Sequence, residues 1–293
     1  MTEQHASEMK RPIDIGYFTV AFIDVLSQRD KLSKITGIPH TEEERAIFIE
    51  QLRDTFGVVD QYRTMFSKFF DTSTNYKPPK IERLNPEQAK DLERLMKCEI
   101  RKQLFSDSMV YYVSLMDKPD RIPITSILSL LSGCAGTFLL SLAEGLTCRG
   151  GIEAGIAAEF FKGEIYGPAL YQAYHLESER AQYPRIVVGD EFCKYLVGEM
   201  NWLGQDVDAS HRQLWGRDCV SWIMTDFDGA QILDYAGEAM KKTFPKLQSS
   251  IESAVKFAHE EWQKFLAIGN TKLAGRYFML YNYLESRREQ FWT

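Results

Sequence analysis

The sequence predicts an α+β protein in which a mostly antiparallel sheet forms a sandwich with flanking helices, extended by a C-terminal helical hairpin. The expected elements follow the order βα…ββαβαβ, which interleaves helices with antiparallel strands. Residues 103–112 (QLFSDSMVYY) place a small polar break between two runs of bulky, β-branched and aromatic residues, which is typical of a tight hairpin. The chain from 247 onward instead carries two apolar stripes at helical spacing, which indicates a pair of antiparallel helices.

Length and composition favour one large globular domain, or one domain with an extension. The 293 residues are 44% hydrophobic and 13% aromatic, which is enough for a substantial core. The net charge of −6 and the pI near 5.5 argue against a nucleic-acid or anionic-membrane binder, because both would need a basic face. An anionic small-molecule substrate stays open, since local charges and metal ions outweigh the global balance.

The cysteines and the apolar segments indicate a cytoplasmic protein. The five cysteines occur singly, without a C-x-x-C pair, which fits a reducing cytosol rather than a disulfide framework or a zinc site. The polar N-terminus, residues 1–13, lacks the apolar stretch of a secretion signal and is expected to be disordered. Residues 122–143 carry no charge and are long enough to cross a bilayer, but Ser, Thr and Gly interrupt them. We therefore expect a buried amphipathic helix there and no membrane span.

The remaining elements can be assigned in chain order. Residues 17–25 (YFTVAFIDV) form the first strand. A capping box beginning at Thr41 opens a long amphipathic helix over 42–70, and Asn85-Pro86 opens a short helix before the hairpin. After the hairpin in the sequence, we expect a helix at 122–146, one or two strands at 148–161 and a helix at 167–181. These are followed by a strand at 185–188, a helix at 190–201, a final strand at 220–225 and a turn at 226–229.

Two carboxylates lie at the ends of segments that we expect to pair. Asp24 stands at the end of the first strand, and Asp107 lies at the hairpin turn. If the two segments share one sheet, these side chains come close together and repel unless a proton or a cation lies between them. The pair therefore indicates a site for a divalent cation with oxygen ligands. Taken alone, the same pattern also fits solvated acids at strand ends.

Three segments, in this order, resemble the class III nucleotidyl cyclases. FIDV at 22–25 resembles the F-x-D-[IV] strand that supplies the first metal carboxylate, and FSD at 105–107 stands where the family has its second metal Asp. RGGIEAG at 149–155, followed by GEIYG at 163–167, is similar to the family's R-x-G-I-x-x-G strand and later D-x-W-G element. Shorter segments resemble the pyrimidine cyclases of Pycsar antiphage systems: VLSQ (25–28), GEIYGPA (163–169), AYHLE (173–177), PRI (184–186) and DFDG (226–229).

The resemblance implies a pyrimidine nucleotide cyclase that converts UTP, or as the second choice CTP, into 3′,5′-cyclic UMP or cyclic CMP and pyrophosphate. Two Mg²⁺ or Mn²⁺ ions per site would be held by Asp24, Asp107 and the carbonyl group of Val25. The resemblance assigns a nucleotidyl cyclase catalytic domain to 14–228 and leaves 229–293 as a helical extension packed on it. The product would be a second messenger in antiphage defence, sensed by a separate effector protein.

The resemblance also implies the contacts to the nucleotide. Ser27, Gln28 and Arg29 would cradle the phosphates with backbone N–H groups and a cation. Gln103 would read the base, because an amide both donates to and accepts from a pyrimidine edge. Glu164 occupies the other base-facing position. Each of these residues also fits a polar surface position.

Two positions depart from the family. Its transition-state Asn and Arg correspond here to Tyr171 and His175, which could hydrogen-bond the ribose or the phosphate but lack arginine's permanent charge. Arg149, Arg185 and Arg217 are candidates to supply that charge. Family enzymes build each site across a homodimer, with the metal ligands from one chain and the base and transition-state groups from the other. The same is expected here.

Three other interpretations fit parts of the sequence. The altered transition-state positions leave open a catalytically silent cyclase-like module that binds a nucleotide or only dimerises. An adenylate or guanylate cyclase is disfavoured, because Gln103 is neither of the usual purine readers. The segment VGDEF at 188–192 is similar to the GGDEF signature of diguanylate cyclases, but it has one glycine and precedes a helix, so this interpretation is discarded.

Overall fold

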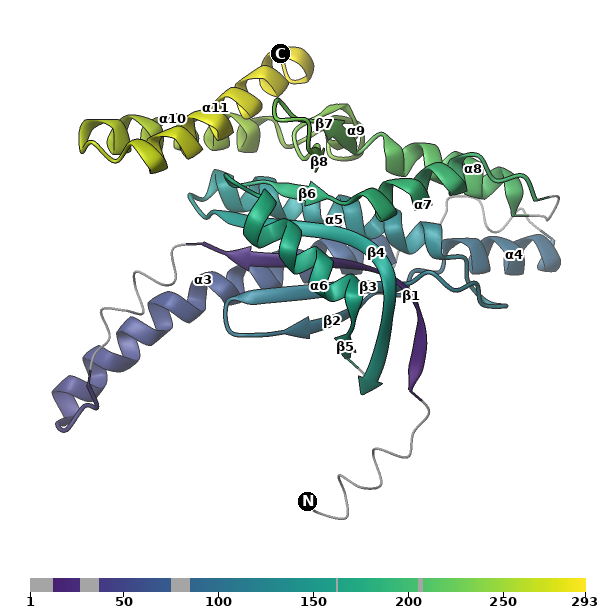
Figure 1. The fold of residues 1–293 in the computed structure, drawn as a ribbon, viewed down its shortest axis with the longest axis horizontal. Coiled ribbons are helices and arrows are strands. Elements are labelled where there is room, and N and C mark those ends of the chain that lie inside the picture. Colours follow the sequence, from purple (N-terminus) through teal and green to yellow (C-terminus); the bar gives the residue numbers. More distant parts are fainter. Residues whose placement is uncertain (1–12, 27–36, 75–84, 162, 205–207) are drawn as a thin grey trace.

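The computed structural model describes residues 13–26, 37–74, 85–161, 163–204 and 208–293. The predicted disordered N-terminus lies outside these residues except for its last position. Within the described part of the chain, eight strands form one sheet in the order β2-β3-β1-β4-β6-β8-β7, with β5 paired to β4 (Figure 1). Helices pack on both faces of this mostly antiparallel sheet, so the predicted α+β fold class is confirmed.

The central antiparallel strands are those that carry the predicted acids. β1 (Asp14–Val25) lies between β3 (Ser108–Ser114) and β4 (Cys148–Phe161) and pairs antiparallel with both. The predicted hairpin is confirmed, since β2 (Arg101–Leu104) runs antiparallel to β3. Because side chains alternate along a strand, one set of β1 residues faces the main core and the other set faces a smaller second core.

The far side of the sheet differs in part from the prediction. β5 (Glu164–Tyr166) pairs antiparallel with β4, whereas β6 (Ile186–Val188) pairs with it in parallel. β7 (Ile223–Thr225) was expected to be the final strand, but β8 (Gln231–Leu233) follows the predicted turn and lies between β6 and β7. The sheet therefore continues past residue 228. β8 was missed because a strand of three residues is too short to show alternation.

The main core is built around the uncharged helix. α5 (Pro123–Ala143) is buried along most of its length, and α3 (Glu42–Thr74) packs across it with Tyr62 and Phe66. Within the described residues, α5 alone is long and apolar enough to span a bilayer, but 83% of its most apolar window is buried. This burial agrees with the predicted core helix. The N-terminal part of α3 projects from the body (Figure 1).

A second, smaller core lies on the opposite face of the sheet. α6 (Pro168–His175) covers it, with Ala169 and Ala173 buried against Val20 and Tyr112 of the central strands. α6 does not run on as one α-helix to residue 181. It changes into a π-helix, η2 (Leu176–Arg180), a form that is frequent at functional sites.

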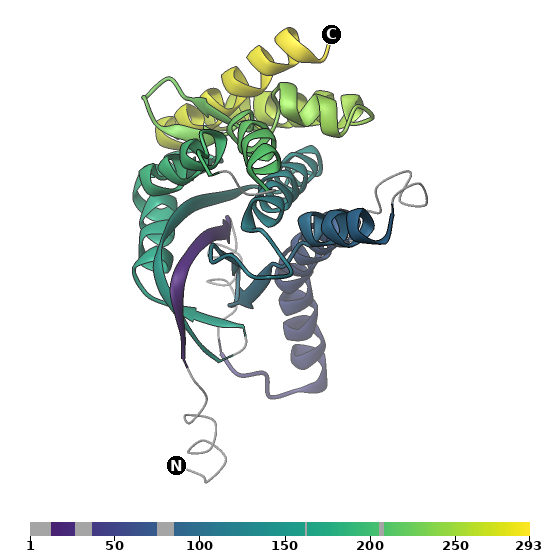
Figure 2. The same cartoon turned by 90° about the vertical axis from the view of Figure 1, so that its right-hand side faces the viewer.

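The predicted C-terminal helical hairpin is confirmed. α10 (Gln248–Ala267) packs antiparallel to α11 (Thr271–Phe291) and also contacts α5, at the end of the molecule opposite the start of β1 (Figure 2). The indole N–H of Trp292 donates to the carbonyl of Ala236 at 2.7 Å, which ties the end of the chain to the body. The remaining helices are α4 (Pro86–Met96), α7 (Asp190–Met200), α8 (Ala209–Val220) and α9 (Glu238–Thr243).

The approach of α6 to β4 gives a test of this packing. A Cβ atom added at Gly151 would lie 2.1 Å from the carbonyl oxygen of Ala173, so the two backbones would have to separate. We expect Gly151→Ala to lower the free energy of unfolding by about 3 kcal/mol, measured by urea denaturation.

The matched control is Gly198→Ala in α7, where an added Cβ meets no atom within 4 Å. This change should raise the free energy of unfolding by about 0.5–1 kcal/mol, because alanine is the better helix former. Equal stability of the two variants would show that α6 and β4 are not packed as described.

Candidate functional site

The register of the central strands brings the two predicted acids to one place. Asp24 lies directly opposite Ser108, the residue after Asp107. The Ser108 hydroxyl donates to Asp24 Oδ1 at 2.8 Å, and the Val25 amide donates to the Asp107 carbonyl at 3.1 Å. Acids 83 positions apart in the sequence thus stand on neighbouring strand ends, as the hairpin pattern predicted.

Asp24 is half-buried, and its surroundings oppose its ionisation. Burial raises the pKa of its carboxyl, and the charge of Asp107 raises it further. The hydrogen bond from Ser108 and the charge of Arg149 act in the other direction without reversing the shift. A further positive charge, such as a bound cation, would favour the ionised form of Asp24.

Arg149 and Glu177 extend this charged group behind Asp24. Arg149 lies opposite Asp24 in the β1–β4 ladder, and its guanidinium pairs with the buried Glu177 of η2 at 2.7 Å. Burial raises the pKa of Glu177 to about 7, with the nearby charge of Asp24 adding to the shift and Arg149 opposing it. Glu177 was not predicted as a site residue, although the AYHLE segment that ends on it was noted.

Two of the three arginines that were candidates to supply the transition-state charge pair with carboxylates. Arg149 pairs with Glu177, and the buried Arg185 pairs with Asp226 and Asp228. Arg217 lies exposed on α8, which packs against α5 and α7 rather than against β1 or β3. Tyr171 and His175 lie together on α6, with their rings stacked at 6.3 Å between centroids.

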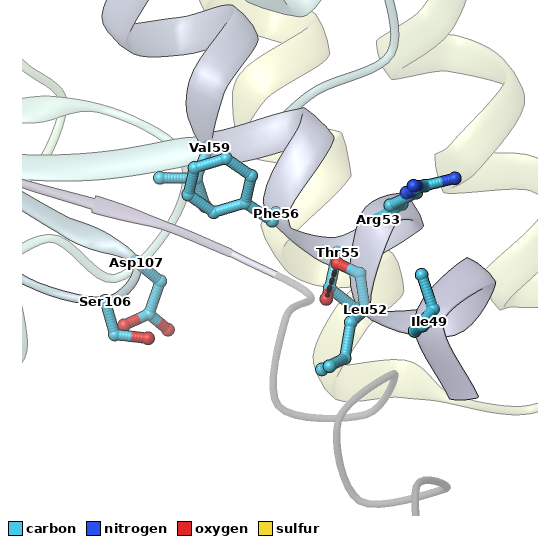
Figure 3. Close-up of a pocket in the computed structure, with 8 residues that line it drawn as sticks. All are labelled: Ile49, Leu52, Arg53, Thr55, Phe56, Val59, Ser106 and Asp107. Carbon is cyan, nitrogen blue, oxygen red and sulfur yellow. Dashed lines mark hydrogen bonds between the residues drawn. The ribbon is translucent and has the colours of Figure 1, made fainter. Parts of the chain in front are cut away.

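A cavity of about 460 Å³ lies beside Asp107. Figure 3 shows Ser106 and Asp107 on one side of it and the side chains of α3 on the other. The α3 side chains that line it are Ile49, Leu52, Arg53, Thr55, Phe56 and Val59. Side chains of α3, most of them apolar, thus face one acid of the pair across this cavity.

A second cavity, of about 590 Å³, lies beneath α6 and is largely aromatic. Phe22, two residues before Asp24, and Phe105, two residues before Asp107, form part of its wall. The ring of Tyr174 packs edge-on against Phe22 at 5.4 Å. The other lining residues are Tyr166, Gly167, Pro168, Leu170 and Tyr171. The cavity offers flat apolar surfaces next to the acids, which suits a nucleobase or a ribose.

The predicted base-reading residues lie on β2 and β5, two strands that meet next to Tyr166 of this cavity. The side-chain oxygen of Gln103 accepts a hydrogen bond from the Ile165 amide at 2.9 Å and so joins β2 to β5. Glu164 is exposed on the same short strand. The predicted phosphate-binding residues Ser27, Gln28 and Arg29 lie outside the described residues.

The donor set fits a hard divalent cation. Among the described residues there is no group of three or more His, Cys, Asp or Glu side chains that could hold a metal ion by themselves. Mg²⁺ commonly binds to one or two carboxylates and completes its shell with water and substrate phosphates. Asp24, Asp107 and the Val25 carbonyl match that pattern, so a cation held there would complete its shell with water or with substrate phosphates.

Comparisons with known proteins give matches by structure but none by sequence. No protein-family model matches the chain, and no curated protein matches its sequence. Four solved chains match by structure, among them a class III adenylyl cyclase-like ATP-binding protein from Pseudomonas aeruginosa. That match has a TM-score of 0.40 and 12% sequence identity over 71% of this chain. The chain spans 40% of the length of that protein.

Proposed function

We propose that the protein is a pyrimidine nucleotide cyclase that converts UTP, with CTP as the second choice, into the 3′,5′-cyclic monophosphate and pyrophosphate. The observation that carries the proposal is the register of β1 with β3 and β4. This register brings Asp24 and Asp107 together beside an aromatic cavity. A phosphate-handling acidic pair next to a base-sized apolar cavity is what nucleotide chemistry requires.

The acids would bind the triphosphate end of the substrate through cations. Asp24 and Asp107, with the Val25 carbonyl, would hold Mg²⁺ or Mn²⁺, two ions per site. Ions held there would supply the positive charge that lowers the pKa of the ribose 3′-hydroxyl and offsets the charge on the leaving pyrophosphate. Asp24 is held for this task by Ser108, and its raised pKa favours an added positive charge.

The aromatic cavity handles the base and the ribose. Phe22, Phe105 and Tyr174 offer faces and edges on which a base can stack. Gln103 of β2 and Glu164 of β5 would read the polar edge of the pyrimidine. Stacking tolerates every base, so the discrimination between pyrimidines and purines would lie with these two side chains.

Tyr171 lines the aromatic cavity of its own chain, and its exposed side, together with His175, would contact the ribose or the phosphate in a partner's site. Tyr171 is 61% exposed and Tyr166 is 72% exposed, with Phe160 and Phe161 also exposed nearby on β4. So much exposed aromatic surface at one site is typical of a protein interface. A homodimer with composite sites would cover this surface and let each chain complete the site of the other.

The biological role follows from the product. A cyclic pyrimidine nucleotide made in the cytoplasm would act as a second messenger in antiphage defence. A separate effector that binds this product would then carry the response.

A silent cyclase-like module is the second candidate. It is favoured by Tyr171 and His175, which replace a catalytic Asn and Arg, and by the engagement of Arg149 and Arg185 with acids. Such a module would bind nucleotides or dimerise without turning them over.

Incubation with each of the four nucleoside triphosphates and Mn²⁺, with products identified by mass spectrometry, separates these candidates. We expect cyclic UMP as the main product. Asp24→Asn and Asp107→Asn should each lower the rate at least ~100-fold with the fold intact by circular dichroism, because each removes a cation ligand. Cyclic AMP or cyclic GMP would indicate a purine cyclase, and binding without product would indicate the silent module.

The raised pKa of Asp24 predicts a pH-dependent stability. A carboxyl whose folded-state pKa lies above its ordinary value of 3.8 holds its proton more tightly in the folded state. Stability is therefore lost as pH rises through the raised pKa. We expect Asp24→Asn to show a higher urea midpoint than the wild type at neutral pH, with the advantage shrinking as the pH falls toward 3.8.

Adding Mn²⁺ at neutral pH should reverse that order, since only the wild type gains a bound cation at Asp24. A variant that is less stable than the wild type at every pH would contradict the assigned environment of Asp24.

The composite site can be tested by mixing two inactive variants. Asp107→Asn and Tyr171→Ala would complement each other in a mixed dimer, since one of its two sites would contain both wild-type residues. Random pairing should recover about a quarter of the wild-type activity. Asp24→Asn mixed with Asp107→Asn is the control, because both lesions fall on the same half of the site and should recover nothing. No recovery in the first mixture would place Tyr171 in the site of its own chain, or outside it.

A further inference from the structure

Helix α3 is fixed against the strand that carries the second acid. Phe66 of α3 is buried and stacks on Tyr111 of β3, with 3.6 Å between ring centroids and 15° between ring planes. Tyr62, on the preceding turn of the helix, is also buried. The helix and the hairpin therefore keep a constant register, so a side chain one turn from Phe66 has a defined position over the hairpin.

That side chain is Arg63. Its Nη2 donates to the carbonyl oxygens of Phe105 and of Ser106, the second at 3.2 Å. These are the two residues that precede Asp107. A charged guanidinium makes stronger hydrogen bonds than a neutral donor, so this contact holds the start of the turn more firmly than a water molecule would.

Two backbone hydrogen bonds also hold the turn that carries Asp107. The Phe105 amide donates to the Ser108 carbonyl at 3.0 Å and closes the hairpin, while the Val25 amide holds the Asp107 carbonyl at 3.1 Å. Arg63 adds the contact on the helix side. Together these bonds fix the backbone from which the Asp107 carboxylate projects.

The position of Arg63 is not explained by an ion pair. Within the part of the chain that the structure describes, no carboxylate pairs with its guanidinium, and its Nε is buried without a partner. An arginine packed in this way loses hydration, and no ion pair compensates for that loss. The hydrogen bonds to the two carbonyl oxygens are therefore the polar contacts that this packing gives Arg63.

We infer that Arg63 is a positioning residue for the cation site, which holds Asp107 in the orientation that binds metal. The inference rests on the proposed function, because it takes Asp107 to be a metal ligand. Arg63 acts through the turn and does not itself bind the cation. Its removal leaves the acids in place but loosens one of them.

The test compares Arg63→Gln and Arg63→Lys with the wild type. Mn²⁺ binding is measured by calorimetry on the full chain without nucleotide, so that no turnover is needed. We expect about tenfold weaker binding for Arg63→Gln, since loss of a group that orients a ligand lowers metal affinity by ~10–100-fold. Arg63→Lys should recover part of the affinity, because an ammonium group can still donate to a carbonyl. Hydrogen exchange of the amides over 103–112 should accelerate in the order wild type, Lys, Gln.

Arg45→Ala is the matched control. Arg45 is an exposed arginine near the start of the same helix, so its loss changes the net charge equally without touching the turn. Mn²⁺ affinity and exchange over 103–112 should match those of the wild type. A drop equal to that of Arg63→Gln would show that the effect is one of net charge and would overturn the inference.

The remaining outcomes separate the two proposals. If the wild type cyclises a nucleotide but Arg63→Gln binds Mn²⁺ equally well, the inference fails and the proposed function stands. If the wild type binds Mn²⁺ and the Arg63 variants bind it more weakly, but no nucleotide is cyclised, the proposed function fails and the positioning role stands. A wild type that binds no Mn²⁺ contradicts both. If Arg63→Gln does not fold, Arg63→Lys gives the same comparison.

Discussion

The half-buried carboxyl of Asp24 is the constraint on which the rest of the site depends. A carboxylate on the central strand of a sheet, half-shielded from water, must be compensated by its neighbours. Ser108 supplies a hydroxyl from one adjoining strand, and Arg149 supplies a positive charge from the other. Arg149 in turn pairs with Glu177, whose burial raises its pKa to about 7. A row of alternating charges thus runs from the strand end into η2.

This row explains the close packing of α6 on the sheet. Glu177 can reach Arg149 only if the end of α6 lies directly on β4, and the absence of a side chain at Gly151 permits this approach. The same helix then forms the wall of the aromatic cavity through Tyr171 and Tyr174. Compensating one half-buried acid therefore also shapes the apolar cavity beside it. An acidic end and an apolar end arise from one packing arrangement.

The sequence predicted the parts of this arrangement that leave a local pattern. The polar break in QLFSDSMVYY located the hairpin and Asp107, and the apolar run before Asp24 located β1. Glu177 could not be identified in this way, because the partner that makes its burial tolerable lies 28 positions earlier on another element. Arg63 was equally hidden, since it contacts backbone carbonyls, which every residue provides. The short strand β8 has too few residues for alternation, and the change from α6 to η2 follows from tertiary contacts.

The arginines of this region differ in how far neighbouring carboxylates neutralise their charge. Arg149 and Arg185 each face carboxylates, so most of their charge is neutralised where they lie. Arg63 contacts two neutral carbonyl groups instead, and dipoles leave a net positive charge in place. A positive charge held against the turn of Asp107 makes the surroundings of the acidic pair less negative. Under the proposed function, the contact that would orient the acid would therefore also reduce the repulsion that a triphosphate meets there.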